Sequence, residues 1–288
     1  MIRVSRTLAA DAMLRIADLI GRIREVIKMM LADDVAIVTG GGRGIGRAIA
    51  RRFAAEGASV VITSRTAAQL ESVAKEIADA GGDAAWVVGD VSREEDAERI
   101  VRTAREKFGH VNILVNNAGI YGPVKPIEEI SVAEWDSVIA IHLRGAFLMT
   151  RAALPELYLQ GRGAVLNISS IAARAAFPWG AAYATAKTGL LGLTRTTAAE
   201  GAKRGIRANA ILPGPVAETE MSQELGRKLA ERTGRDGGEM FKEFLNGILQ
   251  GRPQTADEIA AAAAFLVSDQ ASAITGQGLS VDGGMSFC

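Results

Sequence analysis

Two side chains that could move a proton, Tyr183 and Lys187, stand four residues apart in the stretch YATAK. In a helix this spacing places both side chains on one face. A tyrosine with its ordinary pKa of about 10 is a poor base at neutral pH, but a nearby ammonium favours the phenolate and lowers that pKa. The pair is therefore a candidate for general acid–base chemistry. Taken alone, such a pair in a helix is most often incidental.

A glycine-rich stretch, TGGGRGIG at residues 39–46, has the composition of a binding turn. It follows the apolar run VAIVT and precedes a helical pattern. Where a strand meets a helix in this way, glycines let the backbone approach a pyrophosphate, whose charge the helix N-terminus stabilises. The spacing differs from the common G-x-G-x-x-G fingerprint, and a plain strand-to-helix turn is the alternative interpretation of the glycines alone.

Alternating strands and helices must position these residues. Seven short, apolar runs have the length of strands: 35–39, 59–63, 84–88, 111–115, 163–168, 206–212 and 279–281. Helical patterns separate them, at 45–56, 67–80, 93–108, 131–159, 179–202 and 255–268. This alternation predicts a parallel sheet with right-handed crossovers and helices on both faces. We therefore predict a single-domain, doubly wound Rossmann fold of class α/β over residues 31–288.

The composition limits the classes of function. The chain has 288 residues, with 33 Lys and Arg against 33 Asp and Glu, so it lacks the basic surplus of a general nucleic-acid binder. Its single cysteine, Cys288, excludes an internal disulfide framework and favours a reducing, cytoplasmic location. No apolar run reaches the roughly 18 residues of a membrane span. Two isolated histidines and one terminal cysteine lack the spacing of a metal site.

Four motifs occur in the order typical of one family. They are TGGGRGIG, NNAG at 116–119, YATAK at 183–187 and PG at 213–214. With them the chain resembles the short-chain dehydrogenase/reductase family from about Val35 to Gly284, in particular its 3-oxoacyl-carrier-protein reductases and its polyol, sugar and diol dehydrogenases. The resemblance implies hydride transfer between a nicotinamide and a carbonyl or alcohol carbon. It also implies a homotetramer built on the two long helices.

The resemblance assigns roles to three residues. Tyr183 is the general acid in reduction and the base in oxidation, and Lys187 also binds the nicotinamide ribose. Ser170 stands thirteen residues before Tyr183, the family's spacing for the serine that hydrogen-bonds the substrate carbonyl. Its neighbour Ser169 is the alternative, but alternation along the strand points that side chain elsewhere.

His142 departs from the family's pattern. In WDSVIAIHLRG it stands where an asparagine is usual, at a residue whose backbone carbonyl holds a water that links the lysine to solvent. A backbone carbonyl survives a change of side chain, so His142 can keep this relay or alter its pH response, because histidine titrates near neutrality. The alternative is a tolerated substitution that adds no chemistry.

The end of the second strand discriminates between the two nicotinamide cofactors. An acidic residue there binds the ribose of NAD, whereas a basic residue accommodates the 2′-phosphate of NADP. Here Ser64 stands at the acidic position, Arg65 follows it, and Arg43 lies in the glycine turn. Two guanidinium groups and no carboxylate favour NADP, with NAD still possible. The alternative is that these arginines point to solvent.

Further cofactor contacts are implied by the resemblance. They are Gly40, Gly44, Ile45 and Gly46 in the glycine turn, Asp90 and Val91 at the adenine, Asn117 and Gly119 in the cleft, and Pro213, Gly214, Val216 and Thr219 beside the nicotinamide. The stretch PGPVAETEM carries one extra residue before Thr219, which departs from the family's pattern.

The segment 215–251 is expected to form a substrate lid beyond the strand ends. Its basic cluster is either a surface for an acidic carrier protein or a solvated face, and it comprises Arg227, Lys228, Arg232 and Arg235. The loop 121–126 and the stretch 173–179 should complete the pocket. Phe177 and Trp179 would make that pocket partly apolar.

Residues 1–30 lie outside the expected fold. Apolar residues recur there at helical spacing and predict an amphipathic helix. The alternative is that synthesis begins at Met29 or Met30.

Two classes of function follow. The first is an NADP(H)-dependent oxidoreductase that acts on a 3-oxoacyl thioester, a sugar or polyol, or a small ketone. The second is a regulatory or structural subunit that binds the cofactor with little turnover.

Overall fold

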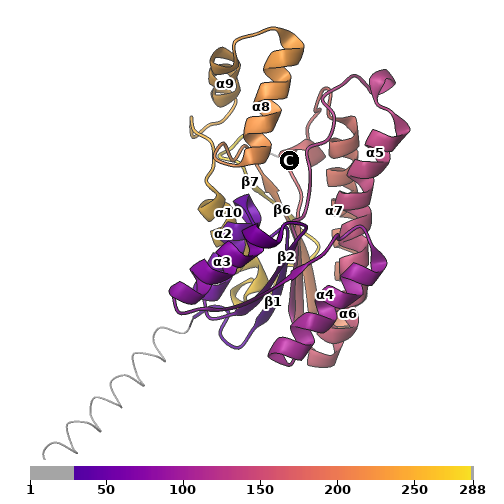
Figure 1. The fold of residues 1–288 in the computed structure, drawn as a ribbon, viewed down its shortest axis with the longest axis vertical. Coiled ribbons are helices and arrows are strands. Elements are labelled where there is room, and N and C mark those ends of the chain that lie inside the picture. Colours follow the sequence, from indigo (N-terminus) through magenta and orange to yellow (C-terminus); the bar gives the residue numbers. More distant parts are fainter. Residues whose placement is uncertain (1–28, 287–288) are drawn as a thin grey trace, which may run out of the picture.

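A seven-stranded parallel sheet forms the centre of the computed structural model, which describes residues 29–286 (Figure 1). The strand order is β3-β2-β1-β4-β5-β6-β7, and every neighbouring pair is parallel. The strands are β1 Val35–Thr39, β2 Ser59–Ser64, β3 Asp83–Val88, β4 Ile113–Asn116, β5 Gly163–Ile168, β6 Ile206–Pro213 and β7 Gly278–Val281. The predicted doubly wound α/β fold is confirmed. The helix expected over residues 1–30 lies, but for its last two residues, outside the described part of the chain.

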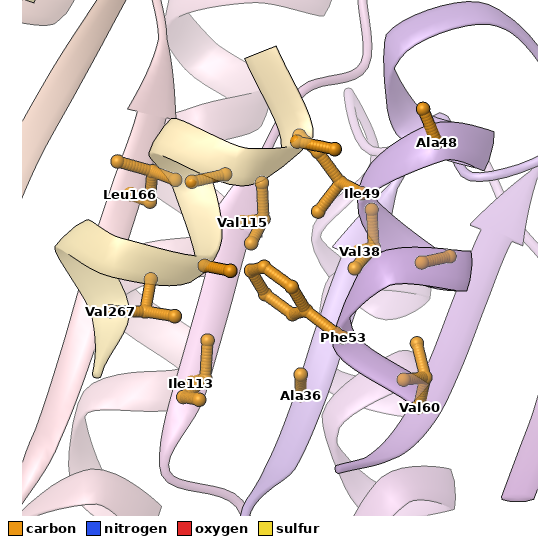
Figure 2. Packing of buried hydrophobic residues seen from close by; sticks show 14 of the residues in the cluster. Ala36, Val38, Ala48, Ile49, Phe53, Val60, Ile113, Val115, Leu166 and Val267 are labelled. Carbon is orange, nitrogen blue, oxygen red and sulfur yellow. The ribbon is translucent and has the colours of Figure 1, made fainter. Parts of the chain in front are cut away.

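Helices cover both faces of the sheet (Figure 1). One layer holds α2 Gly44–Ala55, α3 Ala67–Asp79 and α10 Ala256–Val267, and the other holds α4 Glu94–Phe108, α6 Gly145–Gln160 and α7 Ala181–Gly201. Figure 2 shows the ring of Phe53, which is fully buried, between α2, α10 and the sheet residues Val38 and Val115. Burying such a side chain contributes about 1.5–3 kcal/mol to folding. This core fixes the first strand and the helix that follows it, and with them the turn between.

The two long helices predicted over 131–159 and 179–202 differ in their bounds and continuity from the structure. The region predicted over 131–159 consists of α5 Val132–Ile139, a π-helical turn at Ala140–Arg144, and α6. The region predicted from Trp179 begins only at Ala181, because Trp179 adopts a left-handed φ of 63° that a helix excludes. The π turn spans only five residues, too few for the spacing of apolar residues to reveal it.

The stretch Val132–Gln160 is long and apolar enough to cross a membrane by length and composition, with a mean hydropathy of 1.2 over its best window. In the structure, 44% of that window is buried. Its residues Leu148, Met149, Ala153 and Leu157 pack in the core between the sheet and α4. The apolar residues of this stretch therefore serve to pack the core of the domain.

Two helices stand beyond the carboxyl ends of the strands (Figure 1). They are α8 Glu220–Thr233 and α9 Gly237–Asn246, drawn in orange, and they lie within the segment 215–251. None of their residues is buried, and Phe241 and Phe244 are 42% and 37% exposed. The pair is therefore an appendage to the core at the edge where parallel strands bring their carboxyl ends together.

Candidate active site

The glycine turn joins β1 to α2 at this carboxyl edge. Gly40 and Gly44 have left-handed φ angles of 65° and 52°, and a Cβ at Gly46 would collide with the Gly40 carbonyl. Asn117, after β4, donates from Nδ2 to the Thr39 carbonyl at 2.8 Å, and its backbone N–H donates to Thr39 Oγ1 at 2.9 Å. Glycines therefore give the turn a form that side chains would prevent, and Asn117 holds it in place.

A cavity of about 320 Å³ lies over the turn. Most of the predicted cofactor contacts line it: Gly40, Arg43, Gly44, Ile45, Gly46, Ser64, Arg65, Asp90, Val91, Asn117, Gly119 and Thr219. Five others do not belong to its described lining: Tyr183, Lys187, Pro213, Gly214 and Val216. Val216 is buried in the core, Gly214 packs against Gln254 and Asp282, and Pro213 is the buried last residue of β6.

The cavity lining combines Ser64 and Arg65 with Thr66 and Gln69. Arg43 also lines the cavity and forms an ion pair with Glu220, the first residue of α8. Both side chains are more than half exposed, at 57% and 64%, so the pair is open to exchange. Sequence reasoning missed Glu220, which stands 177 residues after Arg43 and carries no motif.

Ser170, Tyr183 and Lys187 come together where β5 and α7 meet. Lys187 Nζ donates to the Ile168 carbonyl at 2.7 Å and lies 5.5 Å from the centre of the Tyr183 ring. Ser170 lies beside Tyr183, close enough to lower its pKa, and its Oγ accepts a hydrogen bond from the Ala172 backbone N–H at 3.1 Å. Ser169 is instead buried and donates to the Lys187 backbone carbonyl at 2.8 Å, so it anchors α7 to β5. The structure thus brings Ser170 beside the tyrosine and turns Ser169 away.

The acidity of this tyrosine corrects a sequence prediction. The sequence predicts that the Lys187 ammonium lowers the Tyr183 pKa. This prediction is wrong, because burial raises that pKa and Ser170 offsets the rise only in part. The expected ammonium is itself buried, and burial lowers the pKa of Lys187 to about 7. Near neutral pH the lysine is therefore only partly charged. The group poised here is a protonated phenol, which is an acid rather than a base.

The buried Lys187 should make the free energy of unfolding rise with pH above neutrality. Its pKa is about 7 in the folded chain, whereas that of an exposed lysine is about 10.4. Between these values the unfolded chain binds more protons, so raising the pH favours the folded state, by at most about 1.4 kcal/mol per pH unit from this group. Denaturant titrations of the cofactor-free protein from pH 7 to 9 measure the slope. Lys187→Met should flatten it, and an unchanged slope would contradict the assignment.

His142 lies inside the π-helical turn and is 2% exposed. Its Nε2 is 2.6 Å from the Ile120 carbonyl oxygen and 3.0 Å from the Ile120 backbone nitrogen, so the tautomer of the ring decides which of these two hydrogen bonds forms. The ring meets Tyr183 edge-on, with ring centres 5.4 Å apart, and a Cβ at Gly119 would collide with it. Burial, and next the charge of Lys187, lower the His142 pKa to about 3. The prediction of a group that titrates near neutrality is therefore wrong, and the relay through its backbone carbonyl stays a prediction.

The basic cluster of the lid is neutralised. Each of its four side chains lies within ion-pair distance of a carboxylate: Arg227 with Glu231, Lys228 with Glu224, Arg232 with Glu129, and Arg235 with Glu243. Paired charges of this kind on a surface are typical of a solvated face. Of the two interpretations of the cluster, the structure favours the solvated face over a docking surface for an acidic carrier.

Two of these side chains also tie α8 to the loop after β4. Lys228 Nζ donates to the Gly122 carbonyl at 3.3 Å, and Arg232 donates two hydrogen bonds of 3.0 Å to Glu129. Both contacts cross the carboxyl edge of the sheet. These contacts hold α8 against the loop after β4.

Fold and site together define a class, the nucleotide-binding oxidoreductases, and comparison with known proteins gives the family. Residues 39–286 match the family model described as enoyl-(acyl carrier protein) reductase. A levodione reductase of Leifsonia aquatica is 39% identical over 263 residues, 88% of this chain and 94% of that protein. A 3-oxoacyl-[acyl-carrier-protein] reductase of Synechocystis sp. is 36% identical over 257 residues, 88% of this chain and 98% of that protein.

The structural comparison agrees. A crystal structure of levodione reductase superposes with a TM-score of 0.84 at 37% identity, covering 88% of this chain and 98% of that one. The chain belongs to the short-chain dehydrogenase/reductase family. It is an enzyme of the oxidoreductase class, and its cofactor is a nicotinamide dinucleotide. The comparisons do not favour the alternative of a subunit with little turnover.

Proposed function

We propose that this enzyme reduces a ketone to a secondary alcohol with NADPH. The observation that carries the proposal is the cluster of Ser170, Tyr183 and Lys187, together with a cavity over the glycine turn whose lining includes Arg43 and Arg65. We write the reaction as a reduction because Tyr183 is a protonated phenol, the proton donor that a developing alkoxide requires.

The glycine turn is the feature that supports binding of a dinucleotide. Side chains at Gly40 and Gly46 would fill the cradle at the N-terminus of α2, so the turn leaves its backbone open to a pyrophosphate. Arg43 and Arg65 would hold the 2′-phosphate, and Asp90 and Val91 would border the adenine. When bound, NADPH supplies a hydride to the carbonyl carbon.

The chain's own residues would do the rest. Ser170 and Tyr183 donate hydrogen bonds to the carbonyl oxygen and orient it, and Tyr183 gives that oxygen its proton as negative charge develops. Lys187 would hold the nicotinamide ribose and return a proton towards Tyr183. The relay through the carbonyl of His142 belongs to this proposal, as do the lid over 215–251, the contacts from Pro213, Gly214, Val216 and Thr219, the homotetramer and the cytoplasmic location.

A substrate panel tests the proposal. We expect NADPH oxidation with at least one carbonyl class among an acetoacetyl thioester, a ketose, diacetyl and a cyclic ketone, and a slower reaction with NADH. The paired lid charges favour a small ketone over a carrier-bound thioester. NADPH that binds without being oxidised by any member of the panel would count against the proposal.

A further inference from the structure

Tyr121, in the loop after β4, lies against the candidate proton donor. It is 5% exposed, and its ring is stacked on Tyr183 with ring centres 5.1 Å apart and planes 29° from parallel. Phe177 adds a third ring, with its centre 6.1 Å from that of Tyr121 and 6.3 Å from that of Tyr183. The phenol that would protonate the substrate therefore belongs to an aromatic cluster.

The backbone on both sides of Tyr121 is held in place. The backbone of Ile120 contacts His142 Nε2, with the carbonyl oxygen 2.6 Å and the nitrogen 3.0 Å from it. Gly122 has a left-handed φ of 84°, its carbonyl accepts from Lys228 of the lid, and a Cβ there would collide with Val138. The backbone on both sides of Tyr121 is thus held by the π-helical turn and by α8, and the ring itself packs against Tyr183 and Phe177.

Tyr121 also forms a wall of a second cavity, of about 600 Å³, between α5 and the lid. This cavity shares Arg43, Gly119, Ile120, Glu220 and Met221 with the one over the glycine turn, so the two are continuous. Because Tyr121 faces this space and stacks on Tyr183, it lies where a substrate under the lid would approach the phenol.

The charges around this second cavity are compensated. The charged side chains of its described lining each have an opposite partner: Arg43 with Glu220, Lys228 with Glu224 at 2.6 Å, and Glu134 with Lys125 at 2.7 Å. The lining offers hydroxyl groups only from Tyr121 and Ser137. An anionic substrate would have to displace one of these carboxylates to find an oppositely charged partner here, whereas an uncharged substrate would not.

We propose that Tyr121 is a specificity-determining residue that selects uncharged, flat ketones, either cyclic or aryl, whose ring lies against its own. This inference rests on the proposed function. In the reaction the carbonyl carbon takes a hydride from NADPH and the oxygen takes a proton from Tyr183, which gives the secondary alcohol and NADP⁺. Aromatic contacts of this kind correspond to roughly three- to tenfold in kcat/KM.

The test compares acetophenone with 2-octanone, an open-chain ketone of equal carbon number. We expect wild-type kcat/KM with NADPH to favour acetophenone about tenfold. Tyr121→Phe keeps the flat ring and should hold that ratio within about twofold. Tyr121→Leu keeps an apolar side chain without the aromatic plane, and the ratio should fall about three- to tenfold.

The outcomes separate the two proposals. A wild-type enzyme that prefers 2-octanone, or a Tyr121→Leu variant with the wild-type ratio, overturns the role of Tyr121 while ketone reduction stands. A wild-type enzyme that binds NADPH but reduces neither ketone, nor any member of the wider panel, overturns the proposed function itself. The dissociation constant of NADPH, expected within about twofold of wild type, shows that Tyr121→Leu is folded. If Tyr121→Leu does not fold, the proposal is tested by the wild-type preference between acetophenone and 2-octanone and by the same ratio in Tyr121→Phe.

Discussion

Replacing Tyr183 with phenylalanine should lower kcat by about 10²–10⁴-fold, the range that general acid catalysis contributes. The substitution removes one oxygen and keeps the ring, so the stack on Tyr121 and the edge-on contact with His142 remain. It also leaves the glycine turn untouched. The NADPH dissociation constant should therefore stay within about twofold of wild type. Initial rates at saturating ketone and fluorescence titration with NADPH measure the two quantities.

Tyr158→Phe is the matched control for this experiment. Tyr158 lies on α6 with the Arg204 guanidinium 3.8 Å from its ring centre, far along the chain from the glycine turn and outside the aromatic cluster. Deleting its hydroxyl should leave kcat within about twofold. A Tyr183→Phe variant that reduces ketones at the wild-type rate would refute the acid–base role of Tyr183.

The fold was predictable because strand burial and helix periodicity are local properties of the sequence. β5 begins and ends where its apolar run does, at Gly163–Ile168. The π-helical turn was not predictable, since it spans only the five residues Ala140–Arg144, and its one buried side chain is a histidine. The late start of α7 depends on the left-handed backbone of Trp179, a residue type that gives no sign of it.

The site was predictable where motifs carry the chemistry and not where distant residues meet. The spacing in YATAK and the serine before it bring Ser170, Tyr183 and Lys187 together. The sign of the Tyr183 pKa shift depends on burial, which a helical spacing does not reveal. Glu220 is the clearest omission, because only the fold brings it to Arg43.

Replacing both Arg43 and Arg65 with alanine should weaken NADPH binding by about 10²–10³-fold. Each guanidinium that holds a phosphate contributes about 1.5–3 kcal/mol, reduced here because Arg43 is exposed. NADH has no 2′-phosphate, so its dissociation constant should change by no more than about threefold. Titration of the variant with each cofactor measures the difference. Equal losses for the two cofactors would refute the NADP preference.

Replacing Glu220 with glutamine should have the opposite effect, because it should strengthen NADPH binding. In the cofactor-free chain the Glu220 carboxylate occupies Arg43, and a 2′-phosphate would have to displace it from the same guanidinium. Removing its charge frees Arg43 and removes a repulsion, so NADPH should bind about two- to fivefold more tightly at low salt. NADH binding should not change. Glu224→Gln, on the same helix but paired with Lys228, is the matched control and should leave both affinities as they are. Weaker NADPH binding in Glu220→Gln would mean that the ion pair orients Arg43 towards the phosphate rather than competing with it.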